Sequence, residues 1–114
     1  MSLNRELIAA STTPLVLAIL CQGDCYGYAL IKEVREMSGS RITWSDGMLY
    51  PVLRRLESQG FISSYWQVAE SGRRRRYYRI ENGGQRELSL WRVQWTIVGE
   101  VLNRLWSKEG KCST

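Results

Sequence analysis

The spacing of apolar residues changes immediately after Gly60, and this change constrains the fold more than any other feature of the sequence. Before Gly60, apolar residues recur at the three- and four-residue spacing of one helix face: Leu49, Val52, Leu53 and Leu56. After it, residues alternate in two runs that the sequence AESG separates. The sequence therefore predicts a helix that leads directly into a two-stranded β-hairpin.

An isolated hairpin is only marginally stable in water, so one of its faces should pack onto helices. We expect that face to carry Ile62, Trp66, Tyr78 and Ile80. Four consecutive arginines, Arg73 to Arg76, close the same hairpin, and we expect them to project from its tip. The hairpin thus combines an apolar face with a strongly cationic end.

Two further helices are expected ahead of the helix that precedes the hairpin. The first starts near Leu3, with Pro14 expected to kink it or to start its second half, and it ends at Gly23. Asp24 is expected to cap the second, whose one face carries Tyr26, Leu30 and Val34 and which ends at Gly39. Ser45 has the position of an N-cap for the third helix, the one that ends at Gly60.

A long helix is expected from about Asn82 to Ser107. Its apolar residues follow the spacing of helices that pack side by side: Leu88, Trp91, Trp95, Val98, Leu102 and Leu105. Such a stripe on a terminal helix needs a partner. Gly99 lies inside this helix and suggests a close helix approach or a bend.

The chain of 114 residues contains no histidine, and this absence weighs against enzymatic activity. Ser-His-Asp and Cys-His nucleophiles are excluded, and no metal-ligand spacing or phosphate-binding glycine loop is present. We therefore expect no catalytic residue, no metal and no cofactor. Cys21 and Cys25 are read as small packed thiols, with metal binding or redox sensing as the alternative, and Cys112 completes an odd count.

We expect the protein to be cytoplasmic and to have no membrane partner. The apolar stretch from Thr12 to Cys21 is shorter than the roughly 18 to 20 residues of a membrane span. It also lacks the basic flank and the cleavage site of a signal peptide.

The net charge of +5 comes largely from the run Arg73 to Arg76, so a local anionic partner is expected. Three helices followed by an arginine-bearing hairpin are the order of a winged helix-turn-helix, in which the third helix enters the major groove of DNA and the hairpin lies beside it. Arginine releases counterions from DNA and forks onto two phosphate oxygens. The alternative is that the run is only a solvated turn.

The sequences YGYALIKEV, GMLYPVLRRLESQGFISSYW and GRRRRYYRIENGG resemble, in order and spacing, the motifs of the PadR family of bacterial transcriptional regulators. The resemblance covers Cys21 to about Gly84 and points to the short members that end in a single C-terminal helix. It implies a mainly α-helical winged helix-turn-helix with a small β-hairpin in residues 1–81. It also implies a C-terminal dimerisation helix and tail in residues 82–114, and a homodimer formed through the first and last helices.

Eleven residues are expected to meet double-stranded DNA. They lie at the start and on the outward side of the third helix and in the hairpin: Ser45, Asp46, Gly47, Met48, Tyr50, Arg54, Arg55, Arg73, Arg74, Arg75 and Arg76. Alternatives remain open, because Asp46 also suits the helix dipole, Met48 also suits the core, and Arg54 or Arg55 can instead pair with Glu57 or Glu33. Tyr26 or Tyr28 can give a phosphate its hydroxyl. Family members commonly carry threonine where Glu81 stands, so Asn82 is expected to cap a late-starting last helix.

Trp91 and Trp95 lie one turn apart on the apolar stripe of the last helix. Trp95 resembles in position the aromatic residue at the dimer-interface pocket of the short, multidrug-sensing members. A planar, aromatic small molecule stacked between two copies of the chain would then act as an effector. The alternative is that both tryptophans simply fill the dimer core.

Three functions remain: a homodimeric repressor that binds a specific DNA sequence, the same repressor relieved by a small molecule, and a winged helix that binds RNA or an acidic protein partner.

Overall fold

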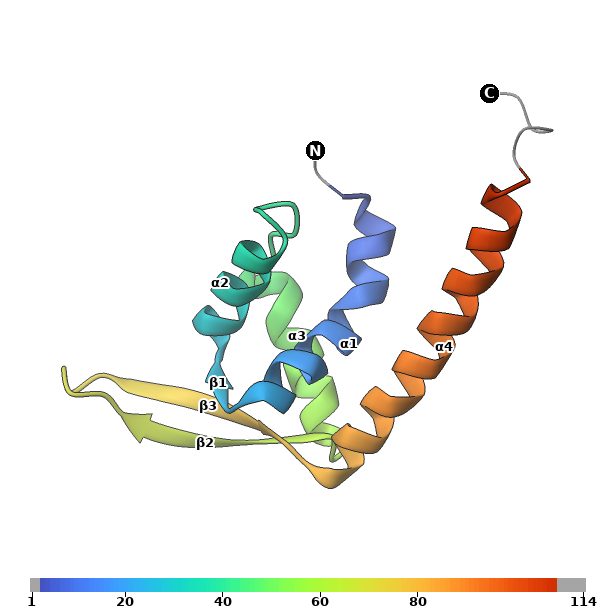
Figure 1. The fold of residues 1–114 in the computed structure, drawn as a ribbon. Coiled ribbons are helices and arrows are strands. Elements are labelled where there is room, and N and C mark those ends of the chain that lie inside the picture. The colour runs from blue at the N-terminus through green and yellow to red at the C-terminus, as the bar shows by residue number, and fades with distance from the viewer. Residues whose placement is uncertain (1–2, 109–114) are drawn as a thin grey trace.

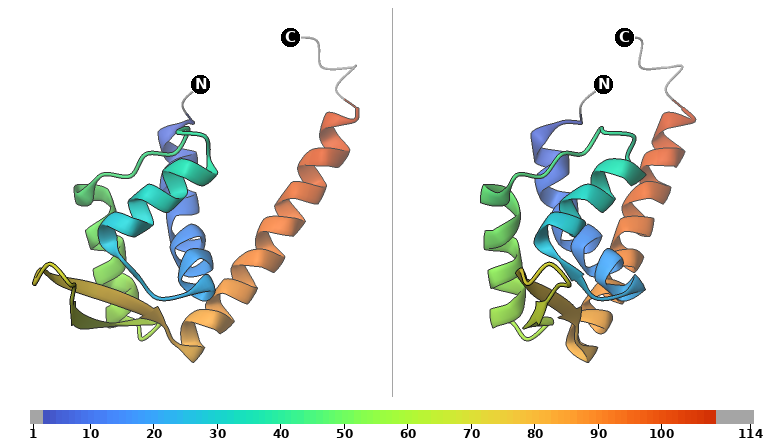
Figure 2. Two further views of the ribbon diagram at one scale, coloured as in Figure 1. Left: turned by 60° about the vertical axis from the view of Figure 1, so that its left-hand side comes forward. Right: turned by 90° about the vertical axis from the view of Figure 1, so that its left-hand side faces the viewer.

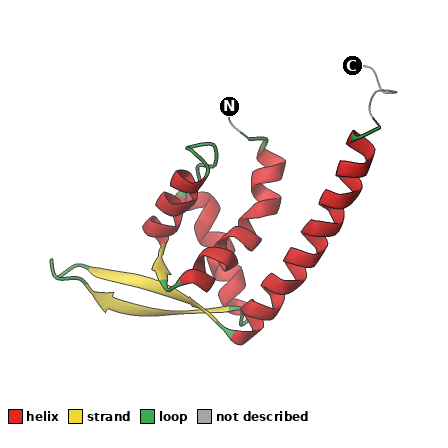
Figure 3. Ribbon diagram, in the orientation of Figure 1, coloured by secondary structure: helices red, strands yellow, loops and turns green. Residues whose placement is uncertain are grey.

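The computed structural model describes residues 3–108, which form four helices and three short strands (Figures 1 and 3). In chain order the elements are α1 (Arg5–Gln22), β1 (Cys25–Tyr26), α2 (Gly27–Met37), α3 (Asp46–Ser58), β2 (Ile62–Val68), β3 (Arg74–Ile80) and α4 (Asn82–Trp106). The fold is mainly helical with a small antiparallel sheet, as expected. Cys112 and the rest of the tail lie outside the described residues.

The core lies where α1, α2 and α3 pack together over the base of the sheet. Its fully buried members are mostly leucines, joined by one tryptophan and three β-branched residues: Leu17, Leu20, Leu30, Leu49, Leu53, Leu56, Trp44, Val16, Ile62 and Thr12. The first helix runs as one element through Pro14, so proline does not divide it into two. Asn4 caps this helix by accepting from the amides of Glu6 and Leu7.

The sheet has three strands in the order β1-β3-β2, so the expectation of a two-stranded hairpin was incomplete. The added strand is two residues long, and it pairs Cys25 with Tyr78 and Tyr26 with Tyr77. Tyr26 therefore belongs to the sheet and not, as predicted, to the face of the second helix. A two-residue strand leaves no alternation for a sequence pattern to detect.

The arginine run lies mostly inside β3 and not at the hairpin tip, which corrects the prediction. The turn spans Ala69 to Arg73, where the Ala69 amide donates to the Arg73 carbonyl, and Gly72 adopts a positive φ of 85°. Arg74 to Arg76 are consecutive strand residues, so their side chains point alternately to opposite faces of the sheet. The hairpin β2-β3 is called the wing below.

Trp66 does not pack onto the helices, contrary to the prediction. It lies on the same face as the buried Ile62 and Tyr78, but 57% of its surface is exposed. The wing extends past the edge of the helical body (Figure 1), so residues near its outer end have no helix above them. Alternation identified the correct face but did not show where the helices stop.

Two predicted caps are wrong and one is confirmed. The N-cap residue of α2 is Tyr26, without a side-chain hydrogen bond, while Asp24 instead binds side chains of the sheet. The N-cap residue of α4 is Glu81, so the helix does not start late after Asn82. Ser45 caps α3 as expected, its hydroxyl accepting from the Met48 amide.

Helix α4 leaves the end of β3 and runs beside α1 at its lower part before diverging from the helical body (Figure 2). Gly84 is its one buried residue, and a Cβ at this position would collide with the Phe61 carbonyl and with Ile80. The bottom of α4 is thus held tightly against the β2 and β3 ends. Around Gly99, by contrast, the described chain leaves open space, so no close approach within one chain explains that glycine.

Within residues 3–108, no helix combines the length and apolarity that crossing a membrane requires.

Candidate nucleic-acid interface

A concave cleft of about 790 Å³ opens between the start of α2, the outward side of α3 and the wing. Seven of the eleven residues predicted to meet DNA line it: Asp46, Tyr50, Arg54, Arg73, Arg74, Arg75 and Arg76. These residues are separated by up to 30 positions in the sequence, and the turn after α3 brings the wing back toward that helix. The wing wall of the cleft is therefore cationic, whereas the α3 wall combines Arg54 with the carboxylates of Asp46 and Glu57.

The cleft is not lined by the other four predicted residues, which are Ser45, Gly47, Met48 and Arg55. Gly47 is exposed with open space around its Cα, so backbone there is accessible. Met48 is partly buried and packs against the core, as the core alternative supposed. Arg55 faces the other way, because its guanidinium donates to the Thr13 hydroxyl on α1 at 2.7 Å.

Each of the three consecutive arginines at the start of β3 contacts a different partner. Arg74 lies over the Trp66 ring at 4.8 Å, and Arg75 lies over the Tyr26 ring at 4.6 Å. Arg76 lies 5.9 Å from the Tyr78 ring centre and forms an ion pair with Glu57. Stacking and pairing restrict the rotamers of these long side chains, which lowers the entropy that they lose on binding a ligand.

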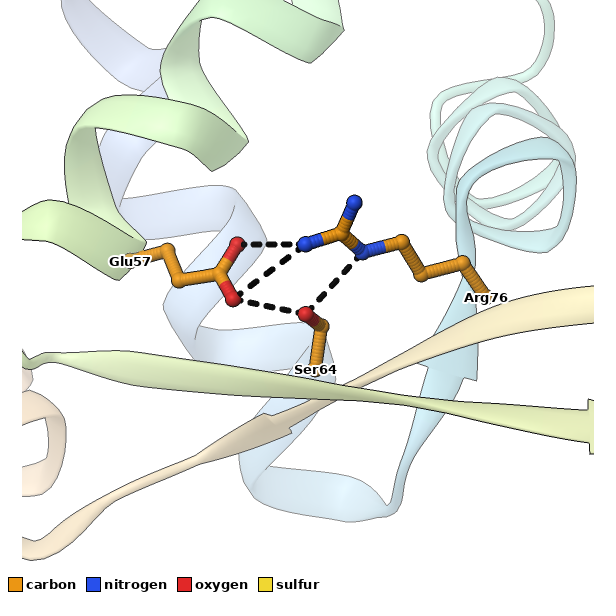
Figure 4. A network of polar contacts seen from close by, with 3 residues as sticks. All are labelled: Glu57, Ser64 and Arg76. Carbon is orange, nitrogen blue, oxygen red and sulfur yellow. Dashed lines mark hydrogen bonds and ion pairs between the residues drawn. The ribbon is translucent and has the colours of Figure 1, made fainter.

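The ion pair of Arg76 is part of a closed ring of contacts (Figure 4). The Ser64 hydroxyl donates to Glu57 Oε2 at 2.6 Å and accepts from Arg76 Nε at 3.0 Å. Arg76 Nη2 donates to Glu57 Oε1 at 3.3 Å and to Oε2 at 3.4 Å. The ring connects the last turn of α3 with both strands of the wing.

The opposite face of the sheet carries a ladder of aromatic rings and arginines. Arg75, Tyr26, Tyr77, Tyr65 and Arg79 follow one another, with neighbouring rings 5.3 and 5.7 Å apart and Arg79 lying 4.9 Å from the Tyr65 ring. Asp24 closes its far end, accepting from Tyr65 Oη at 2.6 Å and forming an ion pair with Arg79 at 3.1 Å. This ladder fastens β1, and with it the start of α2, to the wing.

Two tyrosines of the sheet have a raised pKa, for different reasons. The hydrogen bond that Tyr65 donates to the Asp24 carboxylate raises the pKa of this phenol. Burial raises the pKa of Tyr78, while the nearby Arg76 opposes the shift. Both side chains therefore keep their protons to higher pH than a free tyrosine.

Six cleft residues were not among the eleven predicted DNA contacts: Tyr26, Gly27, Tyr28, Glu57, Trp66 and Tyr78. Tyr28 is exposed on the first turn of α2, and it had been considered as a phosphate contact. A Cβ at Gly27 would collide with the Tyr50 ring, so glycine lets α2 and α3 approach. The position of Glu57 one turn after Arg54 could have indicated that it lies in the cleft. Trp66 was missed because the alternation in its strand predicted a buried side chain.

A second concavity, an apolar groove of about 520 Å³, lies between α1 and α4. Both predicted effector residues, Trp91 and Trp95, line it, with ring centres 6.3 Å apart and planes at 54°. Opposite them lie Leu7, Pro14 and Leu15 of α1. The indole Nε1 of Trp91 is buried without a hydrogen-bond partner in the described part of the chain.

Three packed helices followed by a hairpin that borders the third helix define the winged helix-turn-helix class. Comparisons with known proteins give the family. The sequence pattern described as "Transcriptional regulator PadR-like family" matches residues 16–90, and the chain belongs to that family. The family is one of transcriptional regulators and not of enzymes.

Solved structures of this class are similar over most of the chain. A transcriptional regulator from Clostridium thermocellum has a TM-score of 0.81 and 29% sequence identity, covering 90% of this chain and 96% of that one. A PadR family transcriptional regulator from Eggerthella lenta has a TM-score of 0.78 and 36% identity, covering 89% of this chain and 86% of that one.

Curated relatives also match the chain in sequence. An uncharacterised protein from Lysinibacillus sphaericus is 28% identical over 100 residues, which are 88% of this chain and 92% of the relative. The negative transcriptional regulator PadR of Bacillus subtilis is 23% identical over 87 residues, which are 76% of this chain but only 48% of that protein.

Proposed function

We propose that this PadR-like chain is a homodimeric repressor that binds a specific duplex DNA sequence and is released by a planar aromatic effector. One observation carries the DNA-binding part: Arg54 of α3 and the four consecutive arginines of the wing line a single cleft. Each arginine brought to a phosphate releases counterions, and this release supplies most of the affinity for DNA.

The two walls of the cleft have different tasks in this proposal. Gly47 and Met48 at the start of α3 approach base edges in the major groove, and Asp46 either accepts from a cytosine amino group or serves the helix dipole. Tyr50, Arg54 and the wing arginines other than Arg76 meet the phosphate backbone and fix the register. Arg55 is left out of this set, because its contact with Thr13 directs it toward α1.

The homodimer is supported by the apolar surface of α4. Nine large hydrophobic side chains of this helix are exposed within the described residues: Leu90, Val93, Trp95, Ile97, Val98, Val101, Leu102, Leu105 and Trp106. Leu90, Val93, Ile97 and Val101 form a second stripe that the sequence analysis did not identify. A helix with so wide an apolar surface needs more than α1 to cover it, and a second copy of the chain supplies a matching surface.

The effector is proposed for the groove between α1 and α4. Trp91 and Trp95 already form one aromatic wall there, and a second copy docked along α4 brings the same pair to the other side. A flat ligand held between the copies favours one spacing of the two α3 helices over another. It thereby changes the affinity for two half-sites about one helical turn, roughly 34 Å, apart.

Fluorescence anisotropy tests the DNA-binding proposal directly. The protein is titrated against a labelled duplex from upstream of its own gene, a scrambled duplex and an RNA hairpin, at two salt concentrations. We expect the upstream duplex to bind at least about a hundredfold tighter than the scrambled one, with affinity falling steeply as salt rises. Equal affinity for RNA and duplex DNA would instead favour the RNA-binding alternative. A reporter gene behind the same duplex shows whether binding represses.

Tryptophan quenching tests the effector. A planar cationic dye added to the protein should quench fluorescence in the wild type and in the wing variant Trp66→Phe, but much less in Trp95→Phe. If Trp95→Phe keeps the full quenching while Trp66→Phe loses it, the dye binds the wing and the proposed effector site is wrong.

A further inference from the structure

The ring formed by Glu57, Ser64 and Arg76 sets Arg76 apart from the other wing arginines. Arg76 was predicted to touch DNA, yet its Nε and Nη2 are both committed to Ser64 and Glu57 (Figure 4). Arg73 lies in the turn, and Arg74 contacts only an aromatic ring among the described residues. The wing arginines therefore differ in how free their charge is.

Electrostatics disfavours a switch of Arg76 from Glu57 to a DNA phosphate. The Glu57 carboxylate lines the cleft, and Arg76 neutralises it there. If the guanidinium turned to a phosphate, an unpaired carboxylate would remain facing the polyanion. The attraction gained at one site would be offset by repulsion at the other, so the pair contributes little net charge to DNA binding.

The ring lies where it can hold the outer part of the wing in place. At the base of the wing, Ile62 and Tyr78 are buried in the core, and beyond them Trp66 and Val68 are exposed. Ser64 pairs with Tyr78 and Trp66 pairs with Arg76, so the ring lies where burial ends. It is the outermost hydrogen-bonded contact between α3 and the wing among the described residues, and a hairpin without such support is marginal.

We infer that Arg76 is a positioning residue and not a phosphate contact. The Glu57-Ser64-Arg76 ring holds the outer wing at a fixed angle to α3, so that Arg73 and Arg74 reach the backbone in register with the bases that α3 reads. This inference rests on the proposed DNA-binding function. Arg76 then contributes to the specificity of DNA binding through the position of the wing, and not through its charge.

A thermodynamic cycle on DNA binding tests the inference. Glu57→Gln, Arg76→Gln and the double variant are compared with the matched control Arg74→Gln, using the best duplex and a scrambled duplex. Each of the three ring variants should lower the ratio of the two affinities about fivefold, without additivity. The double variant should keep the wild-type salt slope, whereas Arg74→Gln should reduce the slope by about 0.9. A double variant that loses about 0.9 of the slope would make Arg76 a phosphate contact and overturn the inference.

Lysine substitutions separate geometry from charge. A lysine ammonium keeps the charge but cannot reach Ser64 and both carboxylate oxygens in the fork that arginine makes. Arg76→Lys should therefore lose the affinity ratio as Arg76→Gln does, while Arg74→Lys keeps it. A wild-type ratio in Arg76→Lys would contradict the positioning role.

Hydrogen exchange without DNA keeps the inference independent of the proposed function. Amides of the outer wing, near Gln67 and Arg75, should exchange faster in Glu57→Gln and Arg76→Gln than in the wild type. In the control Arg74→Gln, their exchange rates should equal those of the wild type. If the wild type selects no duplex, the DNA-binding proposal fails while this measurement still tests the ring. If exchange is equal in all four proteins, the ring does not hold the wing, whatever the DNA result.

Discussion

The cleft and the apolar groove lie on different parts of one small chain, and they differ in how complete each is. The cleft is polar, and three of its arginines already contact partners within the chain: Arg74 with Trp66, Arg75 with Tyr26 and Arg76 with Glu57. The groove is lined by apolar side chains and continues into exposed hydrophobic residues along α4. A polar site can be assembled by one chain, whereas an apolar surface of this width requires a second surface to exclude water.

The largest effect is expected from breaking the α4 surface. Val98→Asp with Leu102→Asp should convert the homodimer to a monomer, because two carboxylates cannot be buried unpaired in an apolar interface. Loss of the second half-site contact should weaken specific DNA binding by about a hundredfold or more. Sedimentation and anisotropy measure both changes. Glu100→Gln, on the same exposed helix, is the matched control, and a dimer that survives the double aspartate change would refute the proposed interface.

The next largest effect is expected from removing positive charge from the cleft while the groove stays intact. Arg73→Gln with Arg74→Gln removes two charges, so the salt slope of DNA binding should fall by about 1.8 and affinity should drop about equally for all duplexes. Sedimentation should show the same assembly as for the wild type. Arg55→Gln is the control, because its guanidinium contacts Thr13 outside the cleft, and it should leave the slope unchanged. A slope change in Arg55→Gln would place that residue on DNA after all.

A smaller effect, on stability, is expected at the joint between the two regions. Gly84→Ala forces a methyl group against the Phe61 carbonyl and Ile80, and it should lower the free energy of unfolding by about 1 to 3 kcal/mol. Gly99→Ala meets open space in the chain and should raise helix stability by roughly 1 kcal/mol. Thermal unfolding of both variants gives the comparison. If Gly99→Ala instead destabilises the dimer alone, the second copy packs against Gly99.

The smallest effect concerns the ladder on the outer face of the sheet. Because the folded-state pKa of Tyr65 is raised, the stability that this phenol contributes is fully present below its ordinary pKa near 10, and it is lost as pH rises through the folded value. Tyr65→Phe should therefore remove a small part of the alkaline loss of stability, above about pH 10, and leave neutral DNA binding nearly unchanged. Unfolding curves between pH 8 and 11 and tyrosinate absorbance check this. An unchanged alkaline profile would exclude the Asp24 hydrogen bond as its source.

Local chemistry explains which parts of the fold were predictable from the sequence. Leu49, Leu53 and Leu56 recur at helical spacing, and they are buried as expected because one face of a helix meets the core. Ser45 caps α3 because a hydroxyl at that position reaches an amide of the first turn. Such contacts depend on residues three or four apart in the chain, so a pattern in the sequence contains them.

Several wrong predictions concern positions whose surroundings are set by distant parts of the chain. Asp24 resembles a cap, but the sheet brings Tyr65 and Arg79 to it, and these donors bind the carboxylate instead. Trp66 fits the buried phase of an alternating strand, but no helix reaches the outer wing. Glu81 and not Asn82 precedes α4, because the end of β3 is held by the hydrogen bond from the Glu81 amide to the Phe61 carbonyl.

The site residues divide in the same way into those that the sequence could indicate and those that it could not. The sequence indicated that arginines of the wing and of α3 would share a task, and the cleft brings Arg54 and the wing arginines together. That Arg55 turns to Thr13 and Arg76 turns to Glu57 depends on side chains 42 and 19 residues away. No spacing rule relates residues at such separations.

By itself, the sequence determined the class of this protein: helical periods, a change to strand period at Gly60, a cap at Ser45 and a dense cationic run are local properties, and together they specify a winged helix with a long last helix. The tertiary structure alone decided which arginines keep a free charge, which aromatic side chains remain exposed and which apolar surface remains uncovered. The physical reason is that these properties depend on what packs against a side chain, and its neighbours in space are assembled from all parts of the chain.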